Sequence, residues 1–373
     1  MITEALVVQE PGAPFVYQGI TVEDQLRDDE VLVGIKATGV CHTDLNFAKE
    51  KTVPGLFPGV FGHEGAGVVI KIGAGVTNTS AGDHVLLTYT CCGDCKYCKN
   101  QETSYCYDFE KGNFGVGRSD GSKAYSTDVG GTVTSHFFGQ SSFSKHAIVM
   151  AKSVVKIDKS LPLDDLAPLG CGIMTGAGAM MNVLKPKGDD IVCIVGVGAV
   201  GLAALMALSL SPSPPSKVIA VDIVPDRLEL AKKYGATDVI NSREVNDLKT
   251  ALLEATKGKG VDGTIDTTGR PEIVGNLLKA TAKKGMVVQV GVGQLTAEVS
   301  TCIFDTVNTG RVYLGCAMGS CYPQEFIPLL VGAWKSGYFP FTDLIVKYSA
   351  KDMNNAAKDV LSGKVIKAVL VWE

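Results

Sequence analysis

Residues 191–210 of this chain read IVCIVGVGAVGLAALMALSL, which predicts a buried strand, a tight glycine turn and an apolar helix in succession. The same alternation continues, with strands expected at 218–224, 238–241, 263–269 and 286–293 and an amphipathic helix at 226–236. Continuous apolar strands that alternate with helices are typical of a parallel sheet covered by helices on both faces. We therefore expect an α/β fold with a doubly wound parallel sheet.

Three glycines lie where the first of these strands meets its helix. Gly196, Gly198 and Gly201 have the spacing G-x-G-x-x-G. In this setting the first glycine permits the turn, the second lets backbone approach a pyrophosphate, and the third lets the helix pack on the strand. The free N–H groups at the helix N-terminus attract phosphate. A glycine turn without a ligand is the alternative.

Asp222 closes the next strand, about 20 residues after the third glycine. A carboxylate there accepts hydrogen bonds from the adenosine ribose and repels a 2′-phosphate, which predicts NAD rather than NADP. A surface aspartate without this role is the alternative. Further residues expected at this cofactor site are Val197, Ala199, Val200, Ile223, Arg227 and Val292.

The segment CGDCKYCKNQETSYC contains Cys92, Cys95, Cys98 and Cys106 at the spacing C-x2-C-x2-C-x7-C. Two residues between thiolates allow neighbouring sulfurs to share one tetrahedral zinc ion. Because four sulfurs close the coordination shell, a zinc ion here is expected to be structural. A disulfide cluster is the alternative, which a chain without a secretion signal does not favour.

Three more residues of metal-ligating type stand among glycine and other small residues, which leave room for a ligand. They are Cys41 in VCHTDL, His63 in GHEGAGVV and Cys171 in PLGCGIMTGAGA. A Cys–His–Cys set leaves one position of a zinc ion open, as a catalytic site requires. Their separation is too large for spacing to prove a site, and each alone is more simply a buried core residue.

The composition is that of an ordinary globular protein, with 46% hydrophobic and 20% charged residues among 373, enough for two domains. A net charge of −4 argues against nucleic acid or an anionic membrane as a partner. The first residues, MITEALVVQEPG, lack the basic region of a secretion signal, and no apolar stretch is long enough for a transmembrane helix. With eleven cysteines, these features predict a cytoplasmic protein whose thiols bind metal or pack in the core.

The two ends of the chain differ from its middle. Residues 1–170 are rich in β-branched residues and glycine turns, and they predict short strands at 31–40, 65–76 and 84–90. After about residue 318 the alternation of strands and helices ends, and a final strand is expected at 365–372.

In these motifs the chain resembles the zinc-dependent medium-chain alcohol dehydrogenases. The resemblance covers nearly the full length and is carried by GHEGAGVV, the four-cysteine segment, GVGAVG and VDIVPDRLELAKKYGATDVIN. Within that family the chain is most similar to aryl-alcohol (benzyl-alcohol) dehydrogenases, in CHTDL, HFFGQSSF, PLGCGIMTGAGAMMNVLKP and IKAVL. The resemblance implies a Rossmann domain at 176–318 inserted into a GroES-like β-rich catalytic domain. That domain would comprise 1–175, with a structural-zinc lobe at about 91–107, and 319–373.

The resemblance also implies two zinc ions per chain, with the catalytic zinc bound by Cys41, His63 and Cys171. It implies that Asp44 orients His63, and that Glu64 is a nearby carboxylate able to assist ligand exchange. His42 and Lys367 match positions that contact the pyrophosphate of the cofactor.

The expected reaction is hydride transfer between an alcohol carbon and NAD, with the alcohol oxygen at the open position of the zinc, a Lewis acid. Thr43 follows Cys41 closely enough for its hydroxyl to take the first step of a proton relay. A turn threonine that caps the next helix is the alternative. Many relatives carry a histidine three residues past this threonine, where this chain has Asn46, which cannot titrate. The route of proton exit therefore stays open.

Few charges cluster near the ligand segments, which predicts a small, neutral and apolar substrate. A benzylic or allylic primary alcohol, or its aldehyde, is the expected class. Tyr89 and Phe137 are expected as pocket walls, although aromatic residues are commoner in cores.

Other functions remain open at this point. A polyol dehydrogenase or an S-hydroxymethylglutathione dehydrogenase of the same family is the first alternative. A zinc-free quinone or enoyl reductase would lack both ligand sets, and a cofactor-binding protein without activity is a more distant possibility. Residues 303–320 read as the apolar edge of the nucleotide-binding sheet, which predicts a homodimer or homotetramer.

Overall fold

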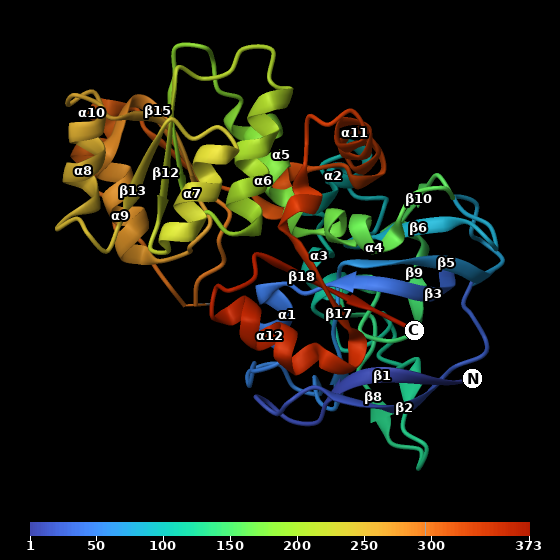
Figure 1. Ribbon diagram of the computed structural model, residues 1–373. Coiled ribbons are helices and arrows are strands. Elements are labelled where there is room, and N and C mark those ends of the chain that lie inside the picture. Colours follow the sequence, from blue (N-terminus) through green and yellow to red (C-terminus); the bar gives the residue numbers. More distant parts are fainter. Residues whose placement is uncertain (295) are drawn as a thin grey trace. The chain divides into compact units, whose positions relative to one another are not determined.

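The computed structural model describes residues 1–294 and 296–373, and the chain divides into two compact units (Figure 1). The first unit contains Met1–Cys171, Tyr322–Val331 and Thr342–Glu373. The second contains Gly172–Cys321 and Gly332–Phe341, so it is inserted between segments of the first.

The second unit is built on a parallel sheet of six strands in the order β13-β12-β11-β14-β15-β16. Their bounds are Ile191–Val195 for β11, Lys217–Asp222 for β12, Asp238–Asn241 for β13, Val261–Asp266 for β14, Thr281–Gln289 for β15 and Val312–Gly315 for β16. This is the doubly wound order expected from the alternating pattern. The order reverses between β11 and β14, and ligands of such sheets bind outside the carboxyl ends of the strands at that point.

Helices cover both faces of this sheet, as the apolar strands require. They are α5 (Gly172–Gly178, continued by a π-helix at Ala179–Leu184), α6 (Ala199–Ala207), α7 (Pro225–Lys233), α8 (Leu248–Ala255), α9 (Pro271–Ala280) and α10 (Ile303–Thr309). On one face Leu248 and Leu252 of α8 and Leu277 of α9 pack against Cys193 and Val221 of the strands. The expectation that 303–320 forms the sheet edge holds only for β16, because Ile303–Thr309 is helical.

The first unit contains two mainly antiparallel sheets, with the strand orders β4-β1-β2-β7-β8 and β10-β6-β5-β3-β18-β17, and β9 pairs with β3 in the second. The strands of the smaller sheet are β1 (Ile2–Val8), β2 (Val16–Val22), β4 (Gly59–Val60), β7 (Tyr125–Ser126) and β8 (Thr132–Val133). Those of the larger are β3 (Glu30–Gly39), β5 (Gly65–Ile72), β6 (His84–Leu87), β9 (His146–Met150), β10 (Val154–Ile157), β17 (Ile345–Ser349) and β18 (Lys367–Val371). Val369 of β18 lies opposite Gly39 of β3, so both ends of the chain build the larger sheet.

Short helices connect these strands. They are α1 (His42–Phe47), α2 (Lys96–Lys99), α3 (Phe109–Asn113), α4 (Leu163–Leu166) and α12 (Met353–Leu361), while α11 spans Pro323–Lys335. Within residues 1–294 and 296–373 no single helix is long and apolar enough to cross a membrane. The bent pair Leu163–Gly170 and Gly172–Leu184 would be long and apolar enough when taken together, by length and composition only.

A buried ion pair attaches the connection between α3 and β7 to the larger sheet. The guanidinium of Arg118 donates through Nε and Nη2 to the two carboxylate oxygens of Glu30, at 2.5 and 3.0 Å. Arg118 also pairs with the half-exposed Glu23, and Nε2 of His136 lies 3.3 Å from Glu30. Because both members of the Arg118–Glu30 pair are buried, their bidentate geometry matters for stability.

Candidate functional site

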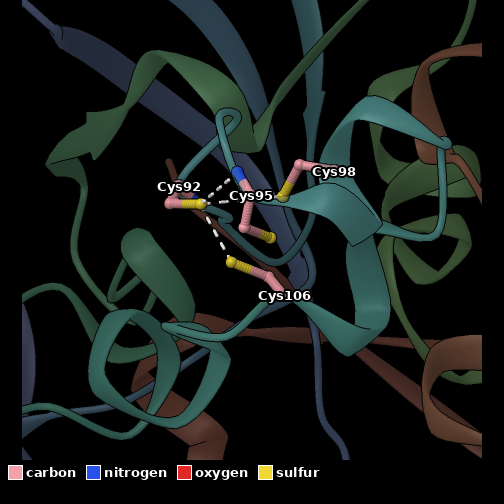
Figure 2. A group of neighbouring side chains, drawn as sticks. All are labelled: Cys92, Cys95, Cys98 and Cys106. Atoms are coloured by element: carbon pink, nitrogen blue, oxygen red, sulfur yellow. Dashed lines mark hydrogen bonds between the residues drawn. The ribbon is translucent and has the colours of Figure 1, made fainter.

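The four cysteines of the expected structural zinc site converge on one point of the first unit (Figure 2). Cys95 is the N-cap of α2, Cys98 lies within that helix, and Cys106 follows a short 3-10 helix. The four sulfur atoms lie within 4.8 Å of one another, and those of Cys92 and Cys98 are 3.9 Å apart. All eleven cysteines are free, so the alternative of a disulfide cluster is not what forms here.

Backbone N–H groups point at these sulfur atoms. Cys92 N–H donates to Sγ of Cys106 at 3.2 Å, and Cys95 N–H donates to Sγ of Cys92 at 3.4 Å. Backbone donors, that of Cys98 first, lower the pKa of Cys95 to about 6. Burial raises the pKa of Cys98 and Cys106 to about 12, which keeps these thiols protonated without a metal. Because a zinc ion binds the thiolate form, its binding would release these protons. Four converging sulfurs with N–H donors fit a zinc ion with a closed shell.

A second donor set in the first unit combines residues from three separate segments. Cys41 is the N-cap of α1, His63 and Glu64 lie just before β5, and Cys171 lies between a 3-10 helix and α5. One donor atom from each of these four residues lies within 4.8 Å of the others. The structure thus brings together the three residues that spacing alone could not connect, with the Glu64 carboxylate beside them.

Asp44 determines the orientation of His63. Nδ1 of His63 donates to Oδ1 of Asp44 at 2.7 Å, and both side chains are fully buried. Asp44 also accepts the backbone N–H groups of Cys41 and Gly62, each at 3.0 Å. Nε2 of His63 is buried and has no hydrogen-bond partner among the described residues. An imidazole held through Nδ1, whose donor set also contains two thiols within 4.8 Å, fits a metal ion.

The two thiols of this set are not equivalent. A hydrogen bond between them lowers the pKa of Cys41 well below the ordinary thiol value and raises that of Cys171 well above it. Sγ of Cys41 also lies 3.7 Å from the hydroxyl of Thr43, so the expected relay hydroxyl is next to the donor set. Asn46 lies on the same helix with an exposed side chain.

Lys367 lies against Glu64 and is almost completely buried. Its Nζ is 2.5 Å from Oε2 of Glu64 and donates to the carbonyl of Val40 at 3.3 Å. Burial lowers the pKa of Lys367, but the Glu64 carboxylate outweighs that effect and raises it. Gly39 makes room for the pair, since a Cβ there would lie 1.8 Å from Glu64. His42, the other expected pyrophosphate contact, begins α1 and is exposed.

Aromatic rings surround His63. Phe138 stacks on the imidazole with ring centroids 4.4 Å apart, and Phe137 meets it edge-on at 5.8 Å. Phe138 has a left-handed backbone (φ 53°), a conformation that costs energy and that neighbouring structure must hold in place. Gln140 supports this loop by accepting the N–H of Gly65 at 3.1 Å and donating to the carbonyl of His63 at 2.9 Å.

Sequence reasoning singled out Phe137 in this loop but missed Phe138 and Gln140. The segment HFFGQ has no periodicity that distinguishes its two phenylalanines, and the role of each ring depends on an irregular backbone. Tyr89, the other expected wall residue, is 2% exposed, and its hydroxyl bonds that of Thr103 at 2.7 Å. Tyr89 therefore packs beside the four-cysteine segment, next to Phe109.

The three glycines of the second unit have three different surroundings. Gly196 has φ 82°, and a Cβ there would lie 2.3 Å from the Thr267 hydroxyl. A Cβ on Gly201 would lie 2.2 Å from the carbonyl of Gly196. A Cβ on Gly198 would meet only Arg227, at 4.0 Å, so this backbone is open to a ligand at the start of α6. These surroundings match the turn, packing and ligand-approach roles of a dinucleotide-binding turn.

Asp222 at the end of β12 is bound to the same turn. Its Oδ2 accepts the N–H of Val197 at 2.8 Å, and its Oδ1 accepts those of Ile223 and Val224 at 2.7 and 3.0 Å. The guanidinium of Arg227 lies 4.0 Å away. This carboxylate therefore shapes the glycine turn in addition to any role toward a ribose. Of the other residues expected here, Ala199 and Val200 begin α6, and Val292 is exposed after β15.

Comparison with known proteins agrees with this architecture. Residues 27–159 match the alcohol dehydrogenase GroES-like domain, and residues 199–332 match the zinc-binding dehydrogenase family. Geraniol dehydrogenase of Castellaniella defragrans is 35% identical over 99% of this chain and 97% of its own length. The S-(hydroxymethyl)glutathione dehydrogenase of Photobacterium damsela subsp. piscicida is also 35% identical, over 99% of this chain and 100% of its own. The crystal structure of benzyl alcohol dehydrogenase from Acinetobacter calcoaceticus is 39% identical, with a TM-score of 0.93 over 100% of both chains.

The expected fold class is confirmed, and so is the family on which the sequence resemblance depended. The similar proteins are named for different substrates. The comparisons therefore support the type of reaction and do not identify the substrate. A GroES-like β unit, a Rossmann-type sheet and a thiolate cluster able to hold zinc occur together in one chain. The chain belongs to the zinc-dependent medium-chain alcohol dehydrogenases, NAD-dependent oxidoreductases that act on CH–OH groups.

Proposed function

We propose that this enzyme interconverts a primary aromatic or allylic alcohol and its aldehyde, with hydride transfer to or from NAD(H). The observation that carries the proposal is the pair of phenylalanines, Phe137 and Phe138, against edge and face of His63. An apolar wall favours a neutral substrate, because a charged one would lose its hydration without gaining a partner. Similarity to dehydrogenases named for geraniol, an allylic alcohol, and for benzyl alcohol supports the same class.

We assign the catalytic zinc to Cys41, His63 and Cys171, and the structural zinc to Cys92, Cys95, Cys98 and Cys106. A zinc ion at the first set would supply a Lewis acid that makes a bound hydroxyl easier to deprotonate. The donor chemistry supports this assignment, since the first set has an unpartnered buried imidazole nitrogen and the second has four converging sulfurs.

The chain's own residues would then carry out orientation and proton transfer. Asp44 keeps the His63 ring in place and keeps the proton on Nδ1, so that Nε2 is free to bind. The Thr43 hydroxyl, next to Cys41, takes the proton of the substrate hydroxyl. Because Asn46 cannot accept a proton, the proton passes from Thr43 to water or to a cofactor hydroxyl. Glu64 stays next to the donor set, where Lys367 neutralises its charge.

The cofactor would bind at the carboxyl ends of the parallel strands in the second unit. The glycine turn at Gly196–Gly201 and the α6 N-terminus would receive the pyrophosphate, and Asp222 the adenosine ribose. Val197, Ile223, Arg227 and Val292 border the same strand ends. His42 and Lys367 are proposed as phosphate contacts, which for Lys367 requires exchange of its partner Glu64.

The substrate class is tested by the rate of NADH formation with benzyl alcohol, geraniol, sorbitol and S-hydroxymethylglutathione. We expect kcat/KM for the first two alcohols to exceed the others by about 100-fold or more. The variant Phe138→Ala should lower kcat/KM for benzyl alcohol more than for ethanol, because a small alcohol gains little from the ring. A preference for S-hydroxymethylglutathione or sorbitol would assign the enzyme to the alternative function.

We also propose that the chain forms a homodimer or homotetramer through the β16 edge of its parallel sheet. Among the described residues, β16 pairs with a strand on one side only. Large apolar side chains of this strand and of the preceding helix are exposed, namely Val312 and Tyr313 in β16 and Ile303, Phe304 and Val307 in α10. Pairing of two such edges across a two-fold axis would cover this surface. Light scattering at micromolar concentration tests the proposal, and a monomeric mass would overturn it.

A cytoplasmic location is proposed on chemical grounds. Six of the thiols belong to the two donor sets, and metal binding requires that they stay reduced. Cell fractionation with an antibody to the chain tests the location.

A further inference from the structure

Asp266 is a buried carboxylate at the carboxyl end of the parallel sheet, and neither the glycine motif nor the zinc sets account for it. It is the last residue of β14 and is fully buried. Its Oδ1 accepts the hydroxyl of Thr268 at 2.7 Å. Its Oδ2 accepts the N–H of Gly269 at 2.9 Å and the side-chain amide of Gln289 at 2.7 Å. None of the ion pairs found in the described part of the second unit includes Asp266.

Gln289 connects this carboxylate to the loop after β15. Its amide nitrogen also donates to the carbonyl of Gly291 at 2.8 Å, and the hydroxyl of Tyr313 donates to its amide oxygen at 3.4 Å. The backbone carbonyl of Asp266 accepts the N–H of Gly291 at 2.9 Å. Side chain and backbone of Asp266 thus hold the loop after β15 against the loop after β14.

Glycines bring these two loops and the dinucleotide turn into direct contact. A Cβ on Gly269 would lie 2.4 Å from the backbone nitrogen of Gly293, and one on Gly293 would lie 2.2 Å from the carbonyl of Gly269. The hydroxyl of Thr267 donates to the carbonyl of Gly196 at 2.7 Å. The loops after β14 and β15 are therefore packed backbone against backbone, and hydrogen bonds from Thr268, Gly269 and Gln289 fix the position of the Asp266 carboxylate beside them.

The position in the sheet indicates which part of the cofactor these loops face. The sheet order reverses between β11 and β14, so a dinucleotide lies across that point with one half over each side. Asp222 on β12 belongs to the side of the adenosine ribose. The loops after β14 and β15 therefore belong to the nicotinamide side. This step rests on the proposed cofactor site.

The nicotinamide ring carries one positive charge when oxidised and none when reduced. The Asp266 carboxylate is buried on the nicotinamide side of the sheet, and none of the ion pairs of the described residues includes it. Its negative charge would therefore attract the oxidised nicotinamide ring in a medium of low dielectric constant. Its hydrogen bonds come from a hydroxyl, a backbone N–H and a side-chain amide, which are neutral donors and do not cancel the charge of the carboxylate. We propose that Asp266 is a specificity-determining residue for the oxidation state of the cofactor, favouring NAD+ over NADH.

The test is equilibrium binding of NAD+ and NADH to the zinc-loaded full chain, with NADH followed by its fluorescence and NAD+ by displacement of NADH. Asp266→Asn has the same shape without the charge. We expect it to weaken NAD+ binding about tenfold and NADH binding less than about threefold. Gln289→Lys is a second variant, because a lysine there can donate to Asp266 and Gly291 while neutralising the charge. It should change the ratio of the two dissociation constants in the same direction.

Asp262→Asn is the matched control. Asp262 lies on the same strand and accepts the N–H of Ile191 at 2.8 Å, at the opposite end of the sheet. It should leave both dissociation constants unchanged. Equal losses of NAD+ and NADH in Asp266→Asn and Gln289→Lys would overturn the charge effect and leave Asp266 a purely structural residue. A wild-type chain that binds neither form would refute the proposed function itself.

Discussion

Nδ1 of His63 donates a hydrogen bond of 2.7 Å to the carboxylate of Asp44, and both side chains are completely buried. The same carboxylate accepts the backbone N–H of Cys41. One acidic side chain therefore determines the position of two of the three residues assigned to the catalytic zinc. The third, Cys171, comes from a segment more than a hundred residues away, and only folding brings it into the set.

Asp44→Ala should weaken the catalytic zinc site without unfolding the chain. Loss of such a partner of a metal-binding histidine typically costs about 10- to 100-fold in metal affinity. Zinc per chain, measured after dialysis against a chelator, should fall from two toward one while the four-cysteine site keeps its ion. Asp128→Ala, at an exposed position, is the control and should retain both ions. Unchanged zinc release in Asp44→Ala would show that His63 binds without this support.

The two cysteine sets should respond differently to single substitutions. Cys171→Ala should lose the catalytic zinc and nearly all turnover. The chain should still fold, because the four-cysteine site keeps its structural zinc ion. Cys95→Ala should lower thermal stability or assembly instead, since a structural zinc ion contributes directly to folding. Elemental analysis and differential scanning calorimetry on both variants distinguish these outcomes. One zinc ion or none in the metal-replete wild type would contradict the assignment of two sites.

Asp222→Gly should weaken NAD binding and make NADP less disfavoured. A charge-assisted hydrogen bond to the ribose is worth about 1.5–3 kcal/mol. The glycine turn should loosen as well, because the N–H groups of Val197 and Ile223 lose their acceptor. Kinetics with both cofactors measure the change. Asp226→Gly, exposed in the first turn of α7, serves as the control for the charge. Efficient use of NADP by the wild type would contradict the role of Asp222.

The proton path is tested at Thr43 and Asn46. Thr43→Val should slow single-turnover oxidation of benzyl alcohol, because it removes the hydroxyl that lies next to Cys41. Asn46→His adds a group that titrates near pH 6.5 at an exposed position of α1. If proton exit limits the rate, kcat should rise and gain a pH dependence in that range.

Cofactor release can also limit kcat, so single-turnover hydride transfer must be followed together with the steady state. A flat response to Asn46→His with a large loss in Thr43→Val would mean that the proton leaves the threonine through water or the cofactor ribose. An unchanged single-turnover rate in Thr43→Val would remove Thr43 from the relay.

Glu30→Gln should destabilise the chain strongly, because it leaves the Arg118 guanidinium buried without its charged partner. Breaking a buried pair in this way costs about 3–5 kcal/mol. Glu23→Gln removes the 47% exposed partner of the same arginine and should cost about 1 kcal/mol or less. The melting temperatures of the two variants are compared directly, because both substitutions replace a glutamate partner of Arg118 by glutamine and remove one charge. Equal effects of the two substitutions would show that burial does not decide the strength of this cluster.

The pH dependence of the destabilisation by Glu30→Gln follows from the pKa of Glu30. Burial raises this pKa, but hydrogen bonds from His136, Arg118 and the backbone of Arg27 outweigh burial and lower it to about 2. The unfolded value is 4.5, so the stabilisation is fully present above about pH 4.5 and is lost as the pH falls toward 2. The loss of melting temperature in Glu30→Gln should therefore be constant between about pH 5.5 and 8. The lowered pKa is tested below that range, because a loss that did not shrink between about pH 4.5 and 2 would contradict it.

Residue spacing in the sequence was sufficient to predict features whose residues all lie within one short segment. The turn at Gly196 and the cysteines from Cys92 to Cys106 lie within single loops, so their residue types and intervals determine what they can bind. The alternation of apolar strands and helices likewise predicted the parallel sheet, because both periods are local properties of the backbone. Its edge was predicted less well, since 303–309 forms a helix before β16 begins.

Only the tertiary structure decided how distant residues meet. Cys41, His63 and Cys171 have no diagnostic spacing, and their convergence depends on the pairing of strands that carry them. The stacking of Phe138 on His63 depends on a left-handed backbone that no periodic pattern reports. The same holds for Asp266, whose carboxylate accepts hydrogen bonds from Gly269 in the loop after β14 and from Gln289 at the end of β15. The sequence by itself determined the elements and the local ligand loops, whereas burial and long-range pairing decided which side chains share one site, because those contacts form only in the folded chain.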